Sequence, residues 1–461
     1  MDLSLMTPLR VLWTRRALER SCGWTRAQID LHQQRQLSEL RRFVLERSPF
    51  YRRFHRGLDQ GPLADLPILT KAVMMENFDD LVTDRAVRLA DIDVFIRRDG
   101  GRGLFHDRYV VLSTSGSTGR RGLFLFDGGE WITVLASISR PLHWAGVQRH
   151  PWRLPRVALI ASSVPWHYSA RISLTLSSRL LPQLRLDATQ PVAEMVRQLN
   201  AWQPEVLATY PYVVRELVEE QIAGRLRIRP GSVMTSAEVL PVETRRRVHT
   251  AWGVSVFDTY GATEYAPIAS ECAYGSKHLF EDGAVIEIVD EKGCAVPVGT
   301  LGDRILLTVF RNRTQPLIRY EISDRVQLSA EECECGRKFL VIDRIEGRIE
   351  EVLLFPRRDR AGVPVPVNPT LFNELLDVLP TSGWQVVQHE DRLSVYLCGL
   401  RDMSVCEPLR RSLVRFLEAQ GALVPLVEVR PVDALERGAT AKAPLVVSRL
   451  PRRESAASDA H

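Results

Sequence analysis

Residues 113–122 read Ser-Thr-Ser-Gly-Ser-Thr-Gly-Arg-Arg-Gly, a composition that suits the binding of phosphate. Glycines let the backbone approach an anion and point successive N–H groups at it, while short hydroxyls add further donors. Arg120 and Arg121 add positive charge. The hydroxyl and glycine residues of the loop are Ser113, Thr114, Ser115, Gly116, Ser117, Thr118, Gly119 and Gly122. The loop lacks the Gly-Lys-Ser/Thr ending of a Walker motif. A structural hairpin is the alternative interpretation.

Two carboxylates farther along the chain could bind other parts of a nucleotide. Glu264 follows an apolar strand and a glycine turn, a position where it could bind Mg²⁺, which takes one or two carboxylates together with substrate phosphates. Asp324 follows Tyr320 beyond a second strand, where it could accept hydrogen bonds from both ribose hydroxyls. A capping residue for Glu264 and a turn residue for Asp324 are the structural alternatives.

Three cysteines and a histidine have the composition of a tetrahedral zinc site. Cys272 and His278 are close in sequence, and Cys333 and Cys335 form a Cys-x-Cys pair farther along. Because cytosolic cysteines in such clusters bind metal more often than they form disulfides, we expect a structural zinc. Four unrelated reduced residues are the alternative. The remaining cysteines, interpreted as ordinary thiols, are Cys22, Cys294, Cys398 and Cys406.

The segments around these residues alternate between short apolar runs and amphipathic stretches. Residues 108–113 and 122–127 predict a strand on each side of the phosphate-type loop. Other runs typical of buried strands occupy 157–162, 205–209, 232–236 and 254–260. Helical periodicity separates these runs, so the sequence predicts a layered α/β fold. Closely spaced strands over 283–310 predict a β-rich insert.

Changes in composition divide the chain into domains. We predict a large N-terminal domain at 1–347 with amphipathic helices at 1–60, a small α+β domain at 348–450, and a disordered tail at 451–461. A proline-rich, irregular segment follows Gly347, and Arg344 and Arg348 lie on either side of this glycine. This arrangement suits a hinge.

The charge and hydropathy of the chain exclude several classes of function. The net charge is +5, and the basic residues are spread among acidic ones rather than gathered in a stripe, so nucleic-acid binding is not expected. No apolar run approaches the roughly 20 residues of a membrane span. Arginines near the N-terminus interrupt any signal-like segment. We therefore predict a cytoplasmic protein, and the excess of arginine over lysine is typical of a GC-rich bacterial genome.

The motifs in this order resemble those of the adenylate-forming enzymes, the superfamily of acyl-CoA synthetases, nonribosomal adenylation domains and luciferases. Within it they resemble the phenylacetate–CoA ligase branch, which includes capsule-type and coenzyme F synthetase-like members. The matching segments are 114–122 (TSGSTGRRG), 235–238 (TSAE), 260–264 (YGATE), 319–324 (RYEISD), 345–348 (IEGR) and 75–85 (MENFDDLVTDR). The resemblance implies a large multilayer α/β domain with a β-rich insert and a small mobile α+β lid.

The resemblance also implies a two-step reaction. A carboxylate would attack the α-phosphate of ATP to give acyl-AMP and pyrophosphate, and a nucleophile, most often coenzyme A, would then take the acyl group. Residues 113–120 would hold the β and γ phosphates, with Thr118 or Ser117 near the Mg²⁺ that Glu264 binds. The other residues that it places at the nucleotide are Ala237, Glu238, Tyr260, Gly261, Ala262, Thr263, Asp324 for the ribose, and Arg344.

On the small domain, the family expects a lysine in a Thr-Gly-Lys phrase that contacts the acyl carboxylate and the phosphate during adenylation. This chain has Lys442 there, after Ala441 in place of the glycine. Arg120 stands where the phosphate loop usually has lysine, and arginine also binds phosphate well. Glu350 is the hinge candidate by position. Some members of the branch carry a structural zinc with the same Cys, His, Cys, Cys order.

Four aromatic side chains lie in the segments from which the family builds its acyl pocket. Trp166, His167, Tyr168 and Tyr210 are expected to line an aromatic pocket in which His167 orients the substrate carboxylate. An aromatic or other small acid is therefore the expected substrate. A cluster of histidine and aromatic residues in the core is the alternative.

Three further alternatives remain open from the sequence. The acyl acceptor could be the phosphopantetheine of a carrier protein or an amine, in a specialised-metabolite or capsule pathway. The chain could also bind nucleotide without catalysis. A homodimer is as compatible with the sequence as a monomer.

Overall fold

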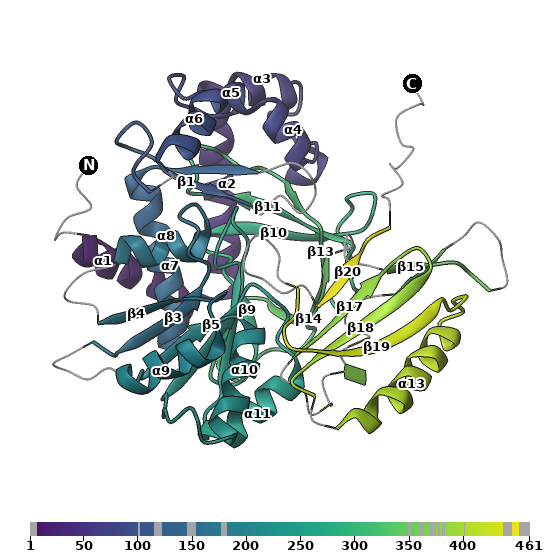
Figure 1. The fold of residues 1–461 in the computed structure, drawn as a ribbon. Helices are drawn as coiled ribbons and strands as arrows, with labels where there is room; N and C mark the ends of the chain where they lie inside the picture. The colour runs from purple at the N-terminus through teal and green to yellow at the C-terminus, as the bar shows by residue number, and fades with distance from the viewer. Residues whose placement is uncertain are drawn as a thin grey trace. The chain divides into compact units, whose positions relative to one another are not determined.

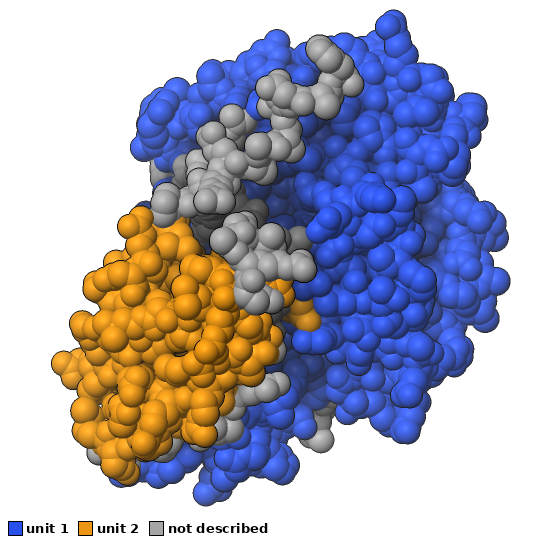
Figure 2. Space-filling view, turned by 90° about the vertical axis from the view of Figure 1, so that its right-hand side faces the viewer, with its two compact units in different colours: residues 1–345, 439–441 blue, residues 346–438, 442–461 orange. Residues whose placement is uncertain are grey.

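The computed structural model divides the chain into two compact units, residues 1–345 with 439–441 (unit 1) and residues 346–438 with 442–461 (unit 2) (Figure 2). The residues that the structure describes are 7–99, 102–114, 122–144, 154–176, 182–348, 353–358, 364–367, 372, 375–376, 379, 381, 383–400, 402–436 and 445–450. The predicted tail at 451–461 lies outside them.

Unit 1 is built on a mixed sheet whose nine strands, counted over the described residues, run in the order β13-β14-β9-β8-β7-β6-β5-β3-β4 (Figure 1). Strands β4, β3, β5, β6 and β7 are parallel, and β8, β9 and β14 extend the sheet with antiparallel pairing. The bounds are β3 (Val157–Ala161), β4 (Gln183–Asp187), β5 (Val206–Thr209), β6 (Ser232–Ser236), β7 (Val256–Tyr260), β8 (Ala269–Glu271), β9 (Lys277–Leu279), β13 (Asp324–Leu328) and β14 (Val341–Arg348). The alternation of apolar runs and helices thus forms the predicted layered α/β sheet.

The helices between the parallel strands cover the sheet with their apolar faces. Leu199 of α9, Leu217 of α10 and Val248 of α11 are fully buried in one core with Ile160 of β3 and Val233 of β6. The helices of unit 1 are α1 (Thr7–Arg20), α2 (Arg26–Arg47), α3 (Pro49–Phe54), α4 (Lys71–Glu76), α5 (Phe78–Leu81), α6 (Leu89–Asp99), α7 (Gly128–Trp144), α8 (Tyr168–Leu176), α9 (Val192–Trp202), α10 (Pro211–Ile222) and α11 (Val242–Trp252). Helices α1, α2 and α3 lie in the N-terminal region where amphipathic helices were expected.

A second, antiparallel sheet of unit 1 forms the predicted β-rich insert. It contains β10 (Ala284–Val289), β11 (Arg304–Val309) and β12 (Tyr320–Ile322). Residues of all three strands share a core with α2 and α7. The segment that follows β11 therefore lies against α7, which brings two stretches far apart in sequence together.

Strands β1 (Val110–Ser113) and β2 (Leu123–Phe126) form an antiparallel pair on the two sides of the phosphate-type loop. Thr114 and Gly122 close the pair, since the Thr114 N–H donates to the Gly122 carbonyl at 2.9 Å and the Gly122 N–H donates to the Thr114 hydroxyl at 2.9 Å. The expected strand on each side of the loop is confirmed, while residues 115–121 lie outside the described residues.

Unit 2 contains a sheet in the order β19-β18-β17-β20 and a hairpin of β15 with β16. Leu409, Leu413 and Leu417 of α13 recur at helical spacing and are buried against this sheet. The bounds are β15 (Leu353–Phe355), β16 (Val365–Val367), β17 (Gly383–Gln388), β18 (Arg392–Cys398), α13 (Cys406–Ala419), β19 (Leu426–Val432) and β20 (Val446–Ser448). Among the described residues, no helix has the length and apolar character needed to cross a bilayer.

Glu130 in the first turn of α7 joins this helix to the segment after β11. Its buried carboxylate accepts hydrogen bonds from the N–H groups of Asp127 at 2.7 Å, Arg313 at 2.6 Å and Thr314 at 2.7 Å. Burial raises the pKa of Glu130 above its ordinary value, and the nearby Asp127 adds to the rise. Three donors on one carboxylate oppose this burial cost.

We expect Glu130→Gln to lower the free energy of unfolding by about 2 kcal/mol, because the amide NH₂ would face backbone donors that need an acceptor. Urea unfolding measures this loss as a lower midpoint. The matched control is Glu46→Gln on the exposed face of α2, which should leave the midpoint in place. An equal midpoint for the two variants would contradict the assignment.

Candidate functional site

The candidate nucleotide residues collect at the carboxyl edge of the parallel strands. In the sheet, β4 lies next to β3 on one side, whereas β6 lies next to β5 on the other side. The chain therefore changes winding direction between β3 and β5. In open α/β sheets, ligands bind outside the carboxyl ends of the strands at such a point. Ser162 after β3 and Tyr210 after β5 meet there, with the Ser162 N–H donating to the Tyr210 hydroxyl at 3.1 Å.

The segment after β6 carries the TSAE motif and a left-handed backbone. Ala237 has φ of 74°, a conformation that costs a non-glycine residue free energy and is often found where a ligand is held. The hydroxyl of Thr235, at the end of β6, donates to Asp258 Oδ1 at 2.7 Å. Ser236 at the end of β6 pairs with Thr259 of β7, so Ala237 and Glu238, both predicted at the nucleotide, follow at this edge.

The segment after β7 is connected to the predicted ribose residue. The Tyr260 hydroxyl donates to Asp324 Oδ2 at 2.5 Å, although these residues are far apart in sequence. A Cβ at Gly261 would lie 2.9 Å from the Ala266 Cβ, so the tight turn into residues 262–264 needs glycine. The sequence placed Tyr260 and Asp324 at one nucleotide, and the structure brings them into direct contact.

Glu264, the predicted Mg²⁺ ligand, is 8% exposed and reaches the β-rich insert. The Tyr320 hydroxyl donates to Glu264 Oε1 at 3.2 Å, and the Asn312 side chain donates to the Glu264 carbonyl at 3.5 Å. Tyr320 is fully buried, so it holds the carboxylate from a rigid strand. Glu264 lies after β7, where the phosphates of a nucleotide are expected. A carboxylate beside phosphate oxygens suits a hard cation such as Mg²⁺.

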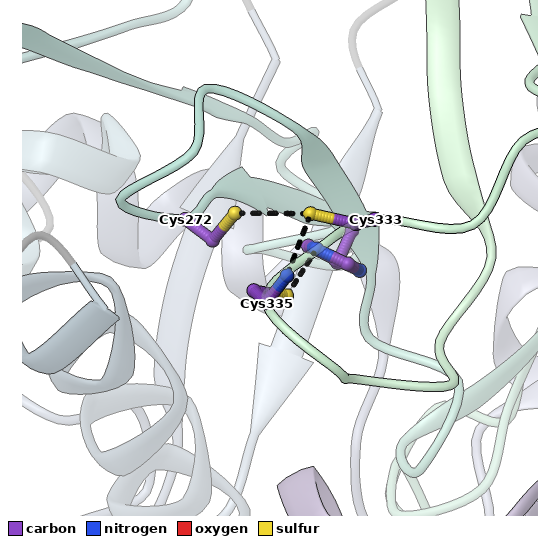
Figure 3. A group of neighbouring side chains, drawn as sticks. Cys272, Cys333 and Cys335 are labelled. Atoms are coloured by element: carbon purple, nitrogen blue, oxygen red, sulfur yellow. Dashed lines mark hydrogen bonds between the residues drawn. The ribbon is translucent and has the colours of Figure 1, made fainter.

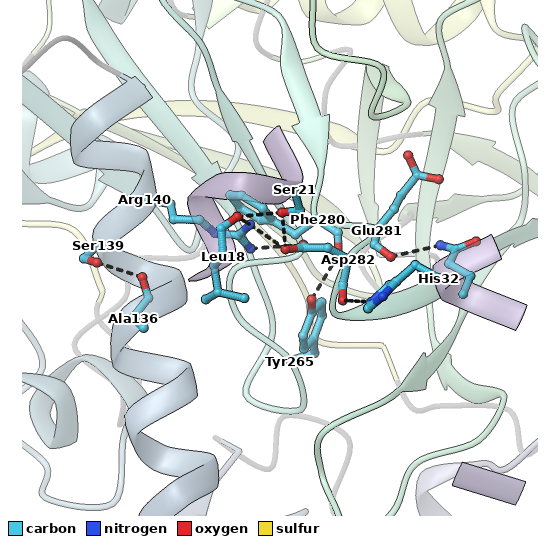
Figure 4. A network of polar contacts seen from close by, with 11 residues as sticks. Leu18, Ser21, His32, Ala136, Ser139, Arg140, Tyr265, Phe280, Glu281 and Asp282 are labelled. Carbon is cyan, nitrogen blue, oxygen red and sulfur yellow. Dashed lines mark hydrogen bonds and ion pairs between the residues drawn. The ribbon is translucent and has the colours of Figure 1, made fainter. Parts of the chain in front are cut away.

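A cavity of unit 1 adjoins Glu264. Its walls come from α7, from the segment after β7 and from the end of β11, and they include Glu130, Arg140, Tyr168, Glu264, Tyr265 and Arg311. The wall is anchored by a buried ion pair between Arg140 and Asp282, 2.8 Å apart, which the Ser21 hydroxyl and the Leu18 carbonyl also contact (Figure 4). The cavity therefore has polar groups held in fixed positions.

The four aromatic residues that were expected to form one pocket have different neighbours in the structure. Tyr168 lines the cavity beside Glu264, and its hydroxyl donates to the Ala266 carbonyl at 2.7 Å. Burial raises the pKa of Tyr168 well above its ordinary value, so this phenol is neutral. His167 Nδ1 lies 2.8 Å from the Ser162 hydroxyl, and Tyr210 contacts the same serine. Trp166 packs with Phe78 and its neighbours in a different apolar cluster.

The predicted zinc ligands form one cluster in unit 1, in which their ligand atoms all lie within 4.8 Å of one another (Figure 3). The Sγ atoms of Cys272 and Cys333 are 3.6 Å apart, and Cys335 Sγ is 3.2 Å from His278 Nε2. A tetrahedral zinc with bonds of about 2.0–2.3 Å separates its ligands by roughly these distances. The four residues therefore fit zinc in number, type and spacing.

The surroundings of His278 also suit a metal ligand. Its Nδ1 lies 3.2 Å from the Phe339 carbonyl, which orients Nε2 toward the cysteines. Burial lowers the pKa of His278, and burial raises the pKa of the Cys272 thiol to about 11. A neutral imidazole is the form that binds zinc, and a cation at the centre would offset the cost of the buried thiolates.

Several predicted residues fall outside the described residues. They are Ser115, Gly116, Ser117, Thr118, Gly119 and Arg120 of the loop, Glu350 and Lys442. Ser113 and Thr114 are described, and Ser113 is buried, with its N–H donating to the Trp166 carbonyl at 3.0 Å. Arg344 lies in β14, close to the division between the two units.

Some residues at the site gave little signal in the sequence. The sequence did not single out Arg140, Asp282 or Glu130, yet all three are buried. Lys277 forms an ion pair with Asp258, with 2.5 Å between Nζ and Oδ2. The scarcity of lysine in this chain was the one signal for Lys277, since only five residues of this type occur.

No protein-family model matches the chain. Its sequence is 25% identical over 375 residues to phenylacetate–coenzyme A ligase of Thermus thermophilus, covering 77% of this chain and 76% of that protein. It is 23% identical over 388 residues to protein CapK of Staphylococcus aureus, covering 79% of this chain and 77% of that protein.

The fold is similar to that of 2-hydroxyisobutyryl-CoA ligase in its postadenylation state with an acyl-AMP bound, with a TM-score of 0.72 and 19% identity. The match covers 93% of this chain and 91% of that ligase. In its thioesterification state, with the acyl-AMP and CoA bound, the TM-score is 0.59 over 94% of this chain and 92% of that ligase.

The fold and the ordered motifs are similar to those of the adenylate-forming enzymes. The two sequence relatives support a similarity to the phenylacetate–CoA ligase-like branch of that superfamily. The expected α/β fold class is confirmed by the same comparisons.

Proposed function

We propose that this protein activates a small carboxylic acid with ATP and Mg²⁺, forms an acyl-adenylate, and transfers the acyl group to coenzyme A. The observation that carries the proposal is the meeting of the predicted nucleotide motifs at one edge of the sheet of unit 1, centred on the contact between Tyr260 and Asp324. The sequence relative from Thermus is a phenylacetate–coenzyme A ligase, which supports CoA as the acceptor.

Each part of ATP would meet a different segment. The loop from Ser113 to Arg120 would hold the β and γ phosphates, with Thr118 near the metal. Asp324 would accept hydrogen bonds from the ribose hydroxyls. Ala237, Glu238 and Tyr260 would border the adenine. Other residues assigned to the nucleotide are Gly261, Ala262, Thr263 and Arg344.

Glu264 would hold Mg²⁺ beside the phosphates. The ion would neutralise negative charge that otherwise repels the attacking carboxylate and that grows at the α-phosphate in the transition state. Tyr320 keeps the Glu264 carboxylate in place from the insert, and Tyr168 and Tyr265 shape the adjoining cavity. We assign the acyl group to the segments that carry Trp166, His167, Tyr168 and Tyr210, of which Tyr168 also lines this cavity.

The small domain would supply the last catalytic group. We propose a mobile domain at 348–450 that turns about Glu350 between the half-reactions, as lids do in many enzymes. Lys442 would contact the acyl carboxylate and the α-phosphate during adenylation. The cluster of Cys272, His278, Cys333 and Cys335 would bind a structural zinc, because four protein ligands leave no open position.

An acid-dependent ATP–pyrophosphate exchange assay across a panel of aromatic and small aliphatic acids tests the proposal. Exchange that depends on one class of acid supports it, and ATP binding without exchange for any acid would favour a nucleotide-binding protein. Trapping the adenylate with CoA, hydroxylamine, an amine panel or a carrier protein then identifies the acceptor. If a product forms only with an amine or only with a carrier protein, that acceptor would replace CoA in the proposal.

We expect Lys442→Ala to reduce exchange by about 100-fold, because a preorganised charge at the reacting phosphate is worth a factor of this size. The second half-reaction, measured with preformed acyl-adenylate and CoA, should change much less. Lys292→Ala, at an exposed lysine of unit 1, is the matched control and should retain full exchange. Equal losses of rate in the two half-reactions would mean that Lys442 has no specific role in adenylation.

A further inference from the structure

The hairpin that carries two of the cluster ligands also carries a lysine that points the other way. Cys272 directly follows β8, and His278 lies in β9. Lys277 is the neighbour of His278 on the same strand, and successive side chains of a strand point to opposite faces of the sheet. His278 therefore contacts the cysteine cluster while Lys277 reaches the neighbouring strands on the other face.

Lys277 continues a line of polar contacts to the TSAE motif. Its Nζ is 2.5 Å from Asp258 Oδ2, and Asp258 Oδ1 accepts the Thr235 hydroxyl at 2.7 Å. Thr235 and Asp258 are also paired in the parallel register of β6 with β7. Two residues after Thr235, the backbone turns through the left-handed Ala237. The contacts thus connect the ligand hairpin with the end of β6.

These groups are buried, and their charges are balanced. The side chains of Lys277 and Asp258 are 14% and 5% exposed. Glu271, the residue opposite Lys277 in the hairpin, accepts the Asp258 N–H at 2.9 Å and forms an ion pair with Arg245 of α11. Removal of the lysine charge would leave a buried carboxylate without its cation, so Asp258 would move.

We infer that Lys277 is a positioning residue for the nucleotide, and that the integrity of the Cys/His cluster sets the affinity for ATP through it. The cluster fixes the hairpin, the hairpin holds Lys277 on Asp258, and Asp258 holds Thr235 and the strained turn at Ala237. Lys277 itself contacts neither acid nor phosphate in this scheme. The inference rests on the proposed binding of ATP at this edge of the sheet.

The test compares Lys277→Met, which keeps the aliphatic stem, with Lys277→Arg, which keeps the charge. We expect Lys277→Met to raise KM for ATP in the exchange assay at least 10-fold, with kcat and KM for the acid within about twofold, and Lys277→Arg to restore most of the affinity. Lys338→Met is the matched control, because Lys338 also lies beside the cluster but pairs with Glu332 at the surface. It should leave all three constants unchanged.

A direct measurement separates this inference from the proposed function. Calorimetric titration with ATP gives the affinity without catalysis, and bound zinc and the melting temperature are recorded for each variant. Cys333→Ser should weaken ATP binding in the same way, and its combination with Lys277→Met should weaken it no further than one change alone. If Lys277→Met does not fold, the paired change Lys277→Met with Asp258→Asn removes both charges and should fold while binding ATP weakly.

The outcomes are distinct. Unaltered ATP affinity in Lys277→Met, with or without a lower melting temperature, overturns the inference and leaves the proposed function standing. If Cys333→Ser and Lys277→Met have additive effects on the affinity for ATP, the Cys/His cluster does not act through Lys277. If the wild-type protein binds ATP but shows no exchange with any acid, the proposed function fails. The comparison of ATP affinities between the variants would still decide the role of Lys277. If the wild-type protein does not bind ATP, both fail.

Discussion

Glu264→Gln is expected to reduce acid-dependent ATP–pyrophosphate exchange by about 100-fold or more at millimolar Mg²⁺, a factor typical of one lost electrostatic contact in a transition state. Glutamine has nearly the shape of glutamate, and the Tyr320 hydroxyl can still donate to its carbonyl oxygen, so the fold should persist. The amide lacks the negative charge that a hard cation requires. The loss should therefore appear in catalysis and in the Mg²⁺ requirement rather than in stability.

The measurement is the exchange rate over a range of Mg²⁺ concentrations for Glu264→Gln and for the control Glu291→Gln, which replaces an exposed glutamate of the same unit. We expect a higher half-saturating Mg²⁺ concentration in the first variant alone. A melting temperature close to that of the wild type would show that the loss is not due to unfolding. Full exchange in Glu264→Gln, with an unchanged Mg²⁺ dependence, would exclude this carboxylate as the metal ligand.

The second large effect is expected at the Cys/His cluster. Cys272→Ser should remove one bound zinc per chain and lower the melting temperature by several degrees, because the free energy of binding a structural zinc contributes directly to folding. Loss of the metal would also leave Cys333, Cys335 and the buried His278 without the cation that holds them together. The segment around Cys333 would then separate from the hairpin of β8 and β9.

Zinc content by elemental analysis and thermal unfolding with and without a chelator measure this prediction. Cys294→Ser is the matched control, since Cys294 is exposed and lies outside the cluster. The chelator should lower the melting temperature of the wild type and of Cys294→Ser toward that of Cys272→Ser. Equal zinc content in the two serine variants would mean that the four residues are not a zinc site.

Much of the fold could be predicted from local pattern. The buried runs that became β3, β5, β6 and β7 are apolar and β-branched, and the intervening helices repeat apolar residues at helical spacing, so both periodicities are visible in the chain. The meeting of Cys272, His278, Cys333 and Cys335 in one cluster could be predicted because cysteine is rare and chemically specific. The boundary of the small domain and the roles of the loop residues, Glu350 and Lys442 stay predictions.

The aromatic segment after β3 shows the limit of this approach. Trp166, His167 and Tyr168 are consecutive, and a pattern of residue types cannot tell which face each will take where a loop enters a helix. The structure sends Trp166 into a separate apolar cluster and leaves Tyr168 beside Glu264. The half-buried indole packs against a cluster whose members are distant in sequence, and the types of the three residues alone do not contain that contact.

The sequence by itself determined the chemical groups of this protein: a loop whose composition suits phosphate, carboxylates predicted to bind a metal and a ribose, and three cysteines and a histidine predicted to bind zinc. Only the tertiary structure decided which charges meet, as in the pairs Lys277 with Asp258 and Arg140 with Asp282. The physical reason is that a buried charge needs a partner within a few ångströms. That partner is supplied by the pairing of strands and the packing of helices, which no short stretch of sequence contains.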